Sequence, residues 1–333
     1  MACRSQRNES AHVNPGLGLG IDAGGTRTRW ALVSSDGALL GEGQVAGLSA
    51  LQMASVDGRT ALQATLASLC HDVLALDLAL DRPLRVCAGL TGLGSGVDGA
   101  GVTLQQWLAD PLAISQECVM LCSDIEIAYR DSFGPALPGE GYLVYAGTGS
   151  IAAWFDIDGQ LQRAGGRGFL LDDGGGGFWI AREALRLIWR REDEAPGSWR
   201  TSTLARAVFD HVGGSDWACS RQFIYGRQRG EIGQLALAVA ACADVDPQAH
   251  AILQQAGGEL ARLALALIAR YGPRPVVLAG RAARLHPEIA TALRAALPPE
   301  IALRQREVHG HIAAARIAAT MQDQVIGARP GQA

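Results

Sequence analysis

The feature of this chain that most constrains its fold is a short glycine-threonine loop that occurs twice. The first copy reads GIDAGGT at residues 20–26, and the second reads YAGTGS at residues 145–150. An apolar stretch follows each loop and ends in an Asp-Gly pair, at residues 36–37 and 158–159, which is a typical hairpin signal. The repeat predicts an internal duplication in which each half opens with a strand, a loop and a hairpin.

Glycine and threonine in such a loop indicate phosphate binding. Glycine lets the backbone approach phosphate oxygens, consecutive N–H groups form an anion site, and a hydroxyl adds one more donor. A dinucleotide loop is a competing interpretation because Gly18, Gly20 and Ala23 match G-x-G-x-x-A, but a hairpin follows where that fold needs a helix. Thr26 and Arg27 replace the Lys-Ser/Thr pair of a Walker A loop. We predict that the two loops bind the phosphates of one nucleotide. The alternative is a pair of ordinary hairpin turns.

The composition is that of a globular protein with two domains of ordinary size. The chain has 333 residues, 48% of them hydrophobic, and a net charge of −4 that argues against a nucleic-acid partner held by charge. Its apolar stretches at 235–242 and 260–269 are too short to span a bilayer and indicate buried helices. Residues 1–15 are polar, without the apolar core of a signal peptide, and are expected to be a disordered leader.

The seven cysteines favour a reducing, cytoplasmic location. They are scattered and include no C-x-x-C pair. Cys118 and Cys122 would share one face of a strand, but with no His or further Cys nearby they are expected in the core rather than as metal ligands.

The order of the elements predicts an α/β protein with mixed sheets flanked by helices. After the first hairpin, the apolar patterns indicate a helix, a strand, a second helix and a second strand, at residues 55–76, 84–88, 103–108 and 119–122. Glycines and prolines at 133–141 predict a crossover, so the first domain is expected to cover 16–138 and the second 139–309. A helix at 310–322, alanine-rich on one face, is expected to pack back onto the first domain, before a flexible tail at 323–333.

Two aspartates follow apolar strands directly, at the edge where open α/β sheets bind ligands. Asp124 could accept the proton of a substrate hydroxyl that attacks phosphorus, or it could simply cap the helix that begins there. Asp22 could hold Mg²⁺, which prefers carboxylates together with phosphate oxygens, or it could hydrogen-bond to its own glycine turn.

The segment at 165–177 is too glycine-rich for a regular element, and it leads into an amphipathic helix at 178–190. Four glycines before a helix N-terminus suit a loop that closes over a ligand, and its apolar residues at 169–171 indicate a docked rather than a loose surface loop. Asp172 or Asp173 could accept hydrogen bonds from sugar hydroxyls. A further strand at 275–279 runs into a glycine turn that could pass over an adenine ring.

Taken in order, these motifs resemble the N-acetylglucosamine kinase family, in the BadF/BadG/BcrA/BcrD ATPase group of the actin-like, sugar kinase and Hsp70 superfamily. The motifs that carry the resemblance are Asp22-x-Gly24-Gly25-Thr26, Ser123-Asp124, residues 146–150, 165–175 and 278–280. The resemblance covers about residues 17–319 and implies two ribonuclease H-like, actin-like ATPase domains with a nucleotide cleft between them. It implies ATP and Mg²⁺ as cofactors, a sugar as acceptor, no nucleic-acid or membrane partner, and a homodimer.

Carried over residue by residue, the resemblance assigns Asp124 as the catalytic base and Asp22 as the metal-binding carboxylate. It assigns the adenosine turn to Gly280. The expected phosphate-binding residues are Gly24, Gly25, Thr26, Gly147, Thr148 and Gly149, and the expected sugar-binding residues are Asp124, Thr148, Gly166 and Asp173. The implied reaction is transfer of a phosphoryl group from MgATP to an amino sugar, most simply to O6 of N-acetylglucosamine.

The chain departs from the family at three positions. Leu51 and Ile151 stand where the family often has sugar-contacting asparagines, and Arg281 replaces the second glycine of the adenosine turn. The sequence therefore leaves glucosamine or another hexose as alternative acceptors. It also leaves an ATPase activator of the same superfamily and a non-catalytic sugar sensor as alternative functions, although no cysteine cluster suits the activator's iron-sulfur centre.

Overall fold

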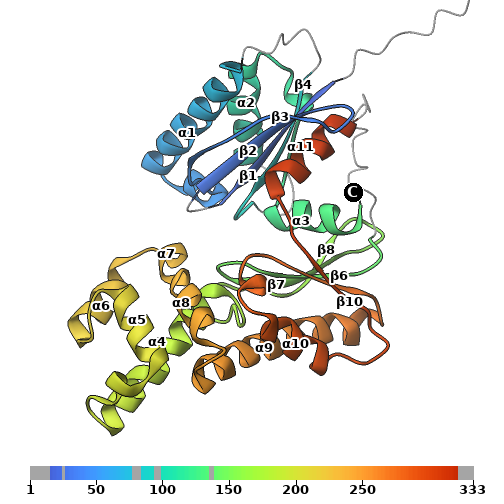
Figure 1. The fold of residues 1–333 in the computed structure, drawn as a ribbon. Helices are drawn as coiled ribbons and strands as arrows, with labels where there is room; N and C mark the ends of the chain where they lie inside the picture. The colour runs from blue at the N-terminus through green and yellow to red at the C-terminus, as the bar shows by residue number, and fades with distance from the viewer. Residues whose placement is uncertain (1–15, 25–26, 77–83, 94–98, 135–138, 322–333) are drawn as a thin grey trace, which may run out of the picture. The chain divides into compact units, whose positions relative to one another are not determined.

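A computed structural model describes residues 16–24, 27–76, 84–93, 99–134 and 139–321. The chain divides into two compact units, each built on one five-stranded sheet (Figure 1). Unit 1 comprises Met1–Ile127 and Gly310–Ala333, and unit 2 comprises Ala128–His309. The division lies earlier in the chain than residue 138, which the sequence analysis gives as the domain boundary.

Unit 1 has the predicted hairpin at the centre of a mixed sheet. Its strands are β1 (Leu17–Ala23), β2 (Arg27–Ser34), β3 (Leu39–Ala46), β4 (Leu84–Leu90) and β5 (Val119–Cys122). The strand order is β3-β2-β1-β4-β5, with β1, β2 and β3 antiparallel and β1, β4 and β5 parallel. The predicted mixed sheet is confirmed, and its three parallel strands end at the same edge.

Unit 2 repeats this topology strand for strand. Its strands are β6 (Tyr142–Ala146), β7 (Ser150–Phe155), β8 (Leu161–Gly165), β9 (Val276–Ala279) and β10 (Leu303–Arg306). Their order is β8-β7-β6-β9-β10, again with an antiparallel hairpin on one side of the first strand and two parallel strands on the other. The same order in both sheets confirms the duplication that the repeated loop predicts.

The helices of unit 1 cover both faces of its sheet. They are η1 (Ala50–Ala54), α1 (Val56–Leu74), α2 (Gly99–Leu112), η2 (Gln116–Cys118), α3 (Asp124–Phe133, which continues into unit 2) and α11 (Gly310–Thr320). Ser55 caps α1, and the buried leucines 62, 66 and 69 of that helix share a core with Leu19 and Ile21 of β1. Because side chains alternate along a strand, Gly18 and Gly20 face the opposite side, where α11 packs.

The two glycines of β1 are explained by α11 rather than by a nucleotide. A Cβ atom at Gly18 or Gly20 would overlap the backbone of α11 at Ala315. The alanines 313, 314, 315 and 318 of α11 are buried, as the predicted small-residue face requires. Helix α11 thus packs on β1 of unit 1, and the pattern that imitates a dinucleotide loop is a helix-packing pattern.

The remaining helices belong to unit 2. They are α4 (Gly177–Glu194), η3 (Ser198–Thr201), α5 (Thr203–Val212), α6 (Trp217–Gly226), α7 (Arg229–Gly233), α8 (Leu235–Cys242), α9 (Pro247–Tyr271), η4 (Ala282–Arg284) and α10 (Pro287–Ala296). Helix α9 packs on the sheet and on α10, whereas α4 to α8 form a helical insertion between β8 and α9 (Figure 1). Within the described ranges, no helix is both long enough and apolar enough to cross a membrane.

Candidate active site

The candidate site of unit 1 lies where its parallel strands end. In the sheet register Asp22 of β1 is opposite Gly89 of β4, and Gly89 is opposite Cys122 of β5. Asp124, two residues after Cys122, and Thr91, two residues after Gly89, therefore extend beyond the same edge as Asp22. The strand-end positions predicted for the two aspartates are confirmed, and the edge is the one at which α/β sheets bind ligands.

Asp124 opens α3 without capping it. The Ser123 hydroxyl accepts a hydrogen bond from the N–H of Glu126 at 3.1 Å, which is the N-cap interaction. Asp124 instead accepts a hydrogen bond from the N–H of Ile125 through Oδ1 at 2.9 Å and from the Thr91 hydroxyl through Oδ2 at 2.7 Å. The alternative in which Asp124 is only a helix cap is therefore wrong, because its neighbour performs that function.

Thr91 is a site residue that the sequence analysis does not identify. Its N–H donates to the carbonyl of Ala23 at 3.1 Å, and its carbonyl accepts from the Ser49 hydroxyl at 2.8 Å and from the N–H of Ala50 at 3.1 Å. The backbone of Thr91 is thus held on two sides while its hydroxyl contacts Asp124. The sequence signal for this residue is a threonine directly after an apolar strand and before a glycine. In the structure that glycine, Gly92, has a left-handed φ of 82°.

Asp22 is half-buried and lies against the start of α11. A Cβ atom at Gly310 would be only 2.7 Å from Oδ2 of Asp22, so the carboxylate faces the positive end of that helix. Among the described residues no group of three or more His, Cys, Asp or Glu could hold a metal ion. An Mg²⁺ bound by Asp22 would take its other ligands from water and phosphate oxygens, the donor set that Mg²⁺ prefers. Gly25 and Thr26 of the predicted first loop lie outside the described residues.

The second predicted phosphate loop, in unit 2, is held by hydrogen bonds to the N-terminus of α4. The N–H of Gly147 donates to the carbonyl of Gly149 at 2.9 Å. The carbonyls of Gly147 and Thr148 accept from the N–H groups of Gly177 and Phe178 at 2.9 and 3.0 Å. These N–H groups belong to the first turn of α4, so the backbone of this helix N-terminus fixes the conformation of the loop.

Asp173 packs against Gly149, the last glycine of the same loop. The residue is only 4% exposed, and its carboxylate lies so close to Gly149 that a Cβ atom there would overlap it. Burial raises the pKa of Asp173, while Arg229 and the N–H groups of Gly168 and Ser150 act in the opposite direction. Nη1 of Arg229 lies 3.4 Å from Oδ2 of Asp173. Arg229, at the start of α7, is a second contact that the sequence analysis does not identify.

The glycine-rich segment before α4 is only partly docked. Phe169 packs edge-on against Phe178 with ring centroids 5.0 Å apart, but Leu170 and Leu171 are 83% and 80% exposed. The prediction that all three apolar residues are docked is therefore wrong for the two leucines. The segment is held without them, because Asp172 pairs with Arg262 of α9 at 3.0 Å and the backbone turns at several left-handed glycines.

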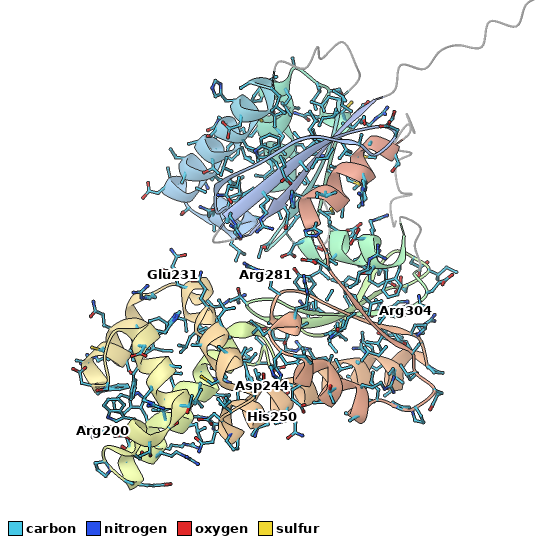
Figure 2. The ribbon with its side chains drawn as sticks, in the orientation of Figure 1. Arg200, Glu231, Asp244, His250, Arg281 and Arg304 are labelled. Carbon is cyan, nitrogen blue, oxygen red and sulfur yellow. The ribbon has the colours of Figure 1, made fainter. Side chains whose placement is uncertain are left out.

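The predicted adenosine turn lies next to the second loop. Strands β6 and β9 are parallel with Tyr145 opposite Ala279, so the chain after β9 leaves the sheet beside the chain after β6. Gly280 has a left-handed φ of 100°, and a Cβ atom there would overlap the carbonyl of Ala146. Arg281 is the following residue and is exposed (Figure 2). The structure thus brings Gly280 together with the loop at 147–149, as a nucleotide site in unit 2 requires.

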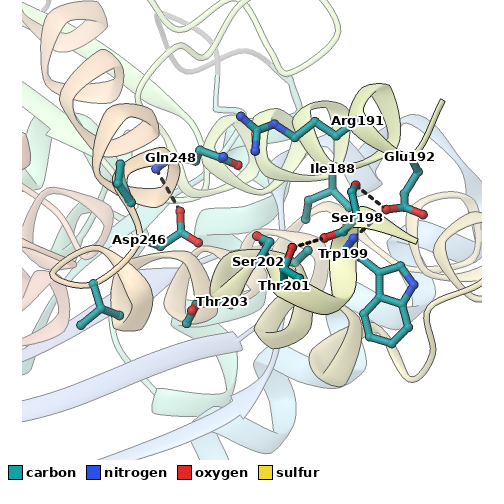
Figure 3. A pocket seen from close by; sticks show the side chains of 13 residues that line it. Ile188, Arg191, Glu192, Ser198, Trp199, Thr201, Ser202, Thr203, Asp246 and Gln248 are labelled. Atoms are coloured by element: carbon teal, nitrogen blue, oxygen red, sulfur yellow. Dashed lines mark hydrogen bonds between the residues drawn. The ribbon is translucent and has the colours of Figure 1, made fainter. Parts of the chain in front are cut away.

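A separate hollow of about 320 Å³ lies in the helical insertion of unit 2 (Figure 3). Both carboxylates that line it accept hydrogen bonds from other residues of the chain. Glu192 accepts hydrogen bonds from Gly197, Ser198 and Trp199, and Asp246 joins α5 to α9 by accepting from Leu204 and Gln248. These contacts stabilise the start of each helix, so the hollow is a structural feature of the insertion.

Comparison with known proteins agrees with this geometry. The model of the BadF/BadG/BcrA/BcrD ATPase family matches residues 19–319. A protein of Chromobacterium violaceum provisionally described as an N-acetylglucosamine kinase is 27% identical, with 91% of this chain and 99% of that chain covered and a TM-score of 0.65. A second protein with that provisional description, from Porphyromonas gingivalis, is 17% identical over 90% of this chain and 98% of its own, with a TM-score of 0.67.

A more distant structure shares the fold. The ROK family glucokinase of Streptomyces griseus, solved with glucose and AMPPNP, is 16% identical over 91% of this chain and 98% of its own, with a TM-score of 0.55. At such identities the Porphyromonas and Streptomyces proteins establish the architecture only.

Proposed function

This chain belongs to the BadF/BadG/BcrA/BcrD ATPase family, and we propose that it is an ATP-dependent kinase whose acceptor is the hydroxyl of an amino sugar. The fold that it shares with sugar kinases is consistent with this enzyme class. N-acetylglucosamine, phosphorylated at O6, is the first acceptor to consider. The observation that carries the proposal is the hydrogen bond that Asp124 accepts from the Thr91 hydroxyl at the carboxyl edge of the unit 1 sheet.

In the proposed reaction Asp124 accepts the proton of the acceptor hydroxyl as that oxygen attacks the γ-phosphorus of ATP. Its Oδ2 is oriented by Thr91 and its Oδ1 by the N–H of Ile125, so the carboxylate is held before substrate arrives. Mg²⁺ on Asp22 would neutralise charge on the phosphates.

The remaining assignments are proposals for binding. Gly24, Gly25 and Thr26, and the loop at 147–149, are the proposed phosphate contacts, and Gly280 is the proposed adenosine contact. For Thr148, Gly166 and Asp173 we keep the proposed role in sugar binding. A sugar hydroxyl bound to Asp173 would compete with the contacts that this carboxylate already makes to Arg229 and to the backbone at Gly149. The cytoplasmic location and the homodimer expected from the sequence also stay predictions.

The test is an ADP-release assay with MgATP and a panel of N-acetylglucosamine, glucosamine, N-acetylmannosamine, glucose and a control without sugar. Stimulation by an amino sugar, lost in the Asp124→Asn variant, supports the proposal. ADP release that no sugar changes favours an ATPase activator. Sugar binding without turnover favours a sensor.

A further inference from the structure

We infer that the ion pair between Arg262 and Asp172 positions the second phosphate loop, at residues 147–149, so that Asp172 contributes to nucleotide binding instead of contacting the sugar. Both are positioning residues, because they act on the nucleotide only through the loop. The inference rests on the proposed function and concerns its phosphate contacts in unit 2.

Arg262 provides a positive charge at a fixed point on α9. Its Nη2 lies 3.1 Å from Oδ1 and 3.0 Å from Oδ2 of Asp172, and its Nε donates to Oε2 of Glu259 at 2.8 Å. Glu259 is three residues earlier in the same helix, which packs against β6, β7 and β8. The guanidinium is therefore held by its own helix while it contacts both carboxylate oxygens of Asp172.

From Asp172 the hydrogen bonds continue to the phosphate loop. Oδ1 of Asp172 accepts from the N–H of Gly174 at 3.3 Å, and the carbonyl of Gly174 accepts from the Ser150 hydroxyl at 2.6 Å. Ser150 directly follows Gly149, the last glycine of the loop. Because Gly174 is bonded to Asp172 on one side and to Ser150 on the other, a displacement of Asp172 also displaces the end of the loop.

The residue between Asp172 and Gly174 needs such an anchor. Asp173 has a left-handed φ of 57°, which is unfavourable for a residue with a side chain and persists only where neighbouring contacts hold it. The carboxylate of Asp173 packs against Gly149. If the anchor at Asp172 were lost and this turn relaxed, Asp173 would move away from the loop.

The same contacts make Asp172 a poor sugar ligand. Both of its oxygens already face the guanidinium of Arg262, and Oδ1 also accepts from Gly174. A sugar hydroxyl bound there would replace a charged donor by a neutral one, and charge-assisted hydrogen bonds are the stronger kind. Of the two neighbouring aspartates, Asp172 is thus the one committed to holding the segment.

The exposure of the pair limits the size of the effect. The side chains of Arg262 and Asp172 are 51% and 28% exposed, and ion pairs with this exposure change an equilibrium by up to about 5-fold. Removal of the pair lowers the fraction of molecules whose loop is ready to bind. The apparent affinity for ATP falls by the same factor as that fraction.

The experiment measures Kd for MgATP by titration calorimetry, together with kcat and KM for N-acetylglucosamine. It compares the wild type with Arg262→Met, Asp172→Asn, the double variant and Arg262→Lys. Asparagine still accepts from Gly174, so Asp172→Asn removes only the charge. Arg270→Met is the matched control, because Arg270 is an exposed arginine of the same helix that donates to the carbonyl of Arg163 in β8.

We expect Kd for MgATP to rise about 2- to 5-fold in each single variant, and no further in the double variant, because the two side chains act as one pair. The values of kcat at saturating ATP and of KM for the sugar should stay within about 1.5-fold of wild type. Arg262→Lys keeps the charge and should recover part of the loss, and Arg270→Met should bind MgATP as the wild type does.

Losses that add in the double variant would overturn the inference while the kinase proposal stands. So would a higher KM for the sugar in Asp172→Asn with unchanged affinity for MgATP, since that result would make Asp172 a sugar ligand. Equal losses of nucleotide and sugar binding, with a lower Tm, would mean that the pair only stabilises the fold. A wild type that binds no MgATP would instead show that the proposed function itself has failed.

Discussion

The hydroxyl of Thr91 donates a 2.7 Å hydrogen bond to Oδ2 of Asp124. The two residues follow neighbouring parallel strands, β4 and β5, so their contact is set by the strand register. A threonine hydroxyl that donates to the proposed base fixes the direction of the carboxylate without supplying a charge of its own. Thr91 is accordingly a positioning residue, and its removal should affect turnover more than acceptor binding.

We predict that Thr91→Val lowers kcat about 10- to 100-fold, because a hydrogen bond to a charged group contributes about 1.5 to 3 kcal/mol. Valine has nearly the same shape, so KM for the sugar should change less than about 3-fold. Thr91→Ser keeps the donor and should restore most of kcat. Steady-state kinetics of both variants provide the check, and equal losses in valine and serine variants would mean that Thr91 acts only through packing.

We predict that Asp124→Asn lowers kcat by a factor of about 10² to 10⁴ while ATP still binds, since the base is needed only in the transfer step. Asparagine can accept from the N–H of Ile125 through its amide oxygen and donate from its amide nitrogen to the Thr91 hydroxyl, so the local structure should persist. The measurement pairs turnover with nucleotide binding by titration calorimetry. Near-normal turnover in this variant would remove Asp124 from the mechanism.

The sequence predicts those parts of the fold and site that depend on local pattern. Apolar runs and Asp-Gly turns identify the strands of both sheets except β10, whose sequence has no apolar run. An aspartate directly after such a run identifies Asp22 and Asp124 as strand-end residues. Local pattern does not decide which neighbouring side chain caps a helix. Ser123 and Asp124 are both good N-cap residues, and only the backbone geometry at the start of α3 selects Ser123.

The contacts that the sequence misses are long-range. Thr91 reaches Asp124 only because β4 pairs with β5 in one register, and Arg229 reaches Asp173 from a helix far along the chain. Hydrophobic character also fails as a guide to docking in the glycine-rich segment. An ion pair and left-handed turns already fix its backbone, so Leu170 has no packing role to fill.

The buried carboxylate of Asp173 should make stability depend on pH through its partner Arg229. Burial raises the pKa of Asp173 above its usual 3.8, so its contribution to stability is full below that value and is lost as pH rises through the native pKa. Arg229 opposes this loss. We predict that Arg229→Met lowers the free energy of unfolding by about 1 to 3 kcal/mol at pH 7.5, because a buried acceptor loses its charged partner.

The loss should shrink as the pH falls, because a protonated Asp173 needs no counter-charge. Urea unfolding of wild type and variant at pH 4.5 and 7.5 measures the difference. Arg227→Met is the matched control, since Arg227 pairs with the exposed Glu231 at 3.7 Å and should show little effect at either pH. Equal losses for Arg229→Met at both pH values would contradict the role given to Asp173.

Two adjacent glycines in α9 should respond oppositely to the same substitution. Gly258 is exposed, and a Cβ atom there would have no neighbour within 4 Å. Gly257 is buried against α10, where a Cβ atom would overlap the carbonyl of Ile289 and lie 2.7 Å from Cβ of Ala292. Alanine favours a helix over glycine by about 0.5 to 1 kcal/mol, so Gly258→Ala should raise the free energy of unfolding by about that amount.

Gly257→Ala makes the same gain in helix propensity but must push α10 away from α9, which costs about 1 to 3 kcal/mol for overpacking, so this variant should be less stable than the wild type. Thermal and urea unfolding of both variants provide the test, and each variant controls for the propensity term in the other. Because both sites are in unit 2 and neither is part of the candidate site, turnover at low temperature should remain close to wild type in Gly258→Ala. A Gly257→Ala variant as stable as the wild type, or more stable, would show that α9 and α10 do not approach each other as closely as Gly257 requires.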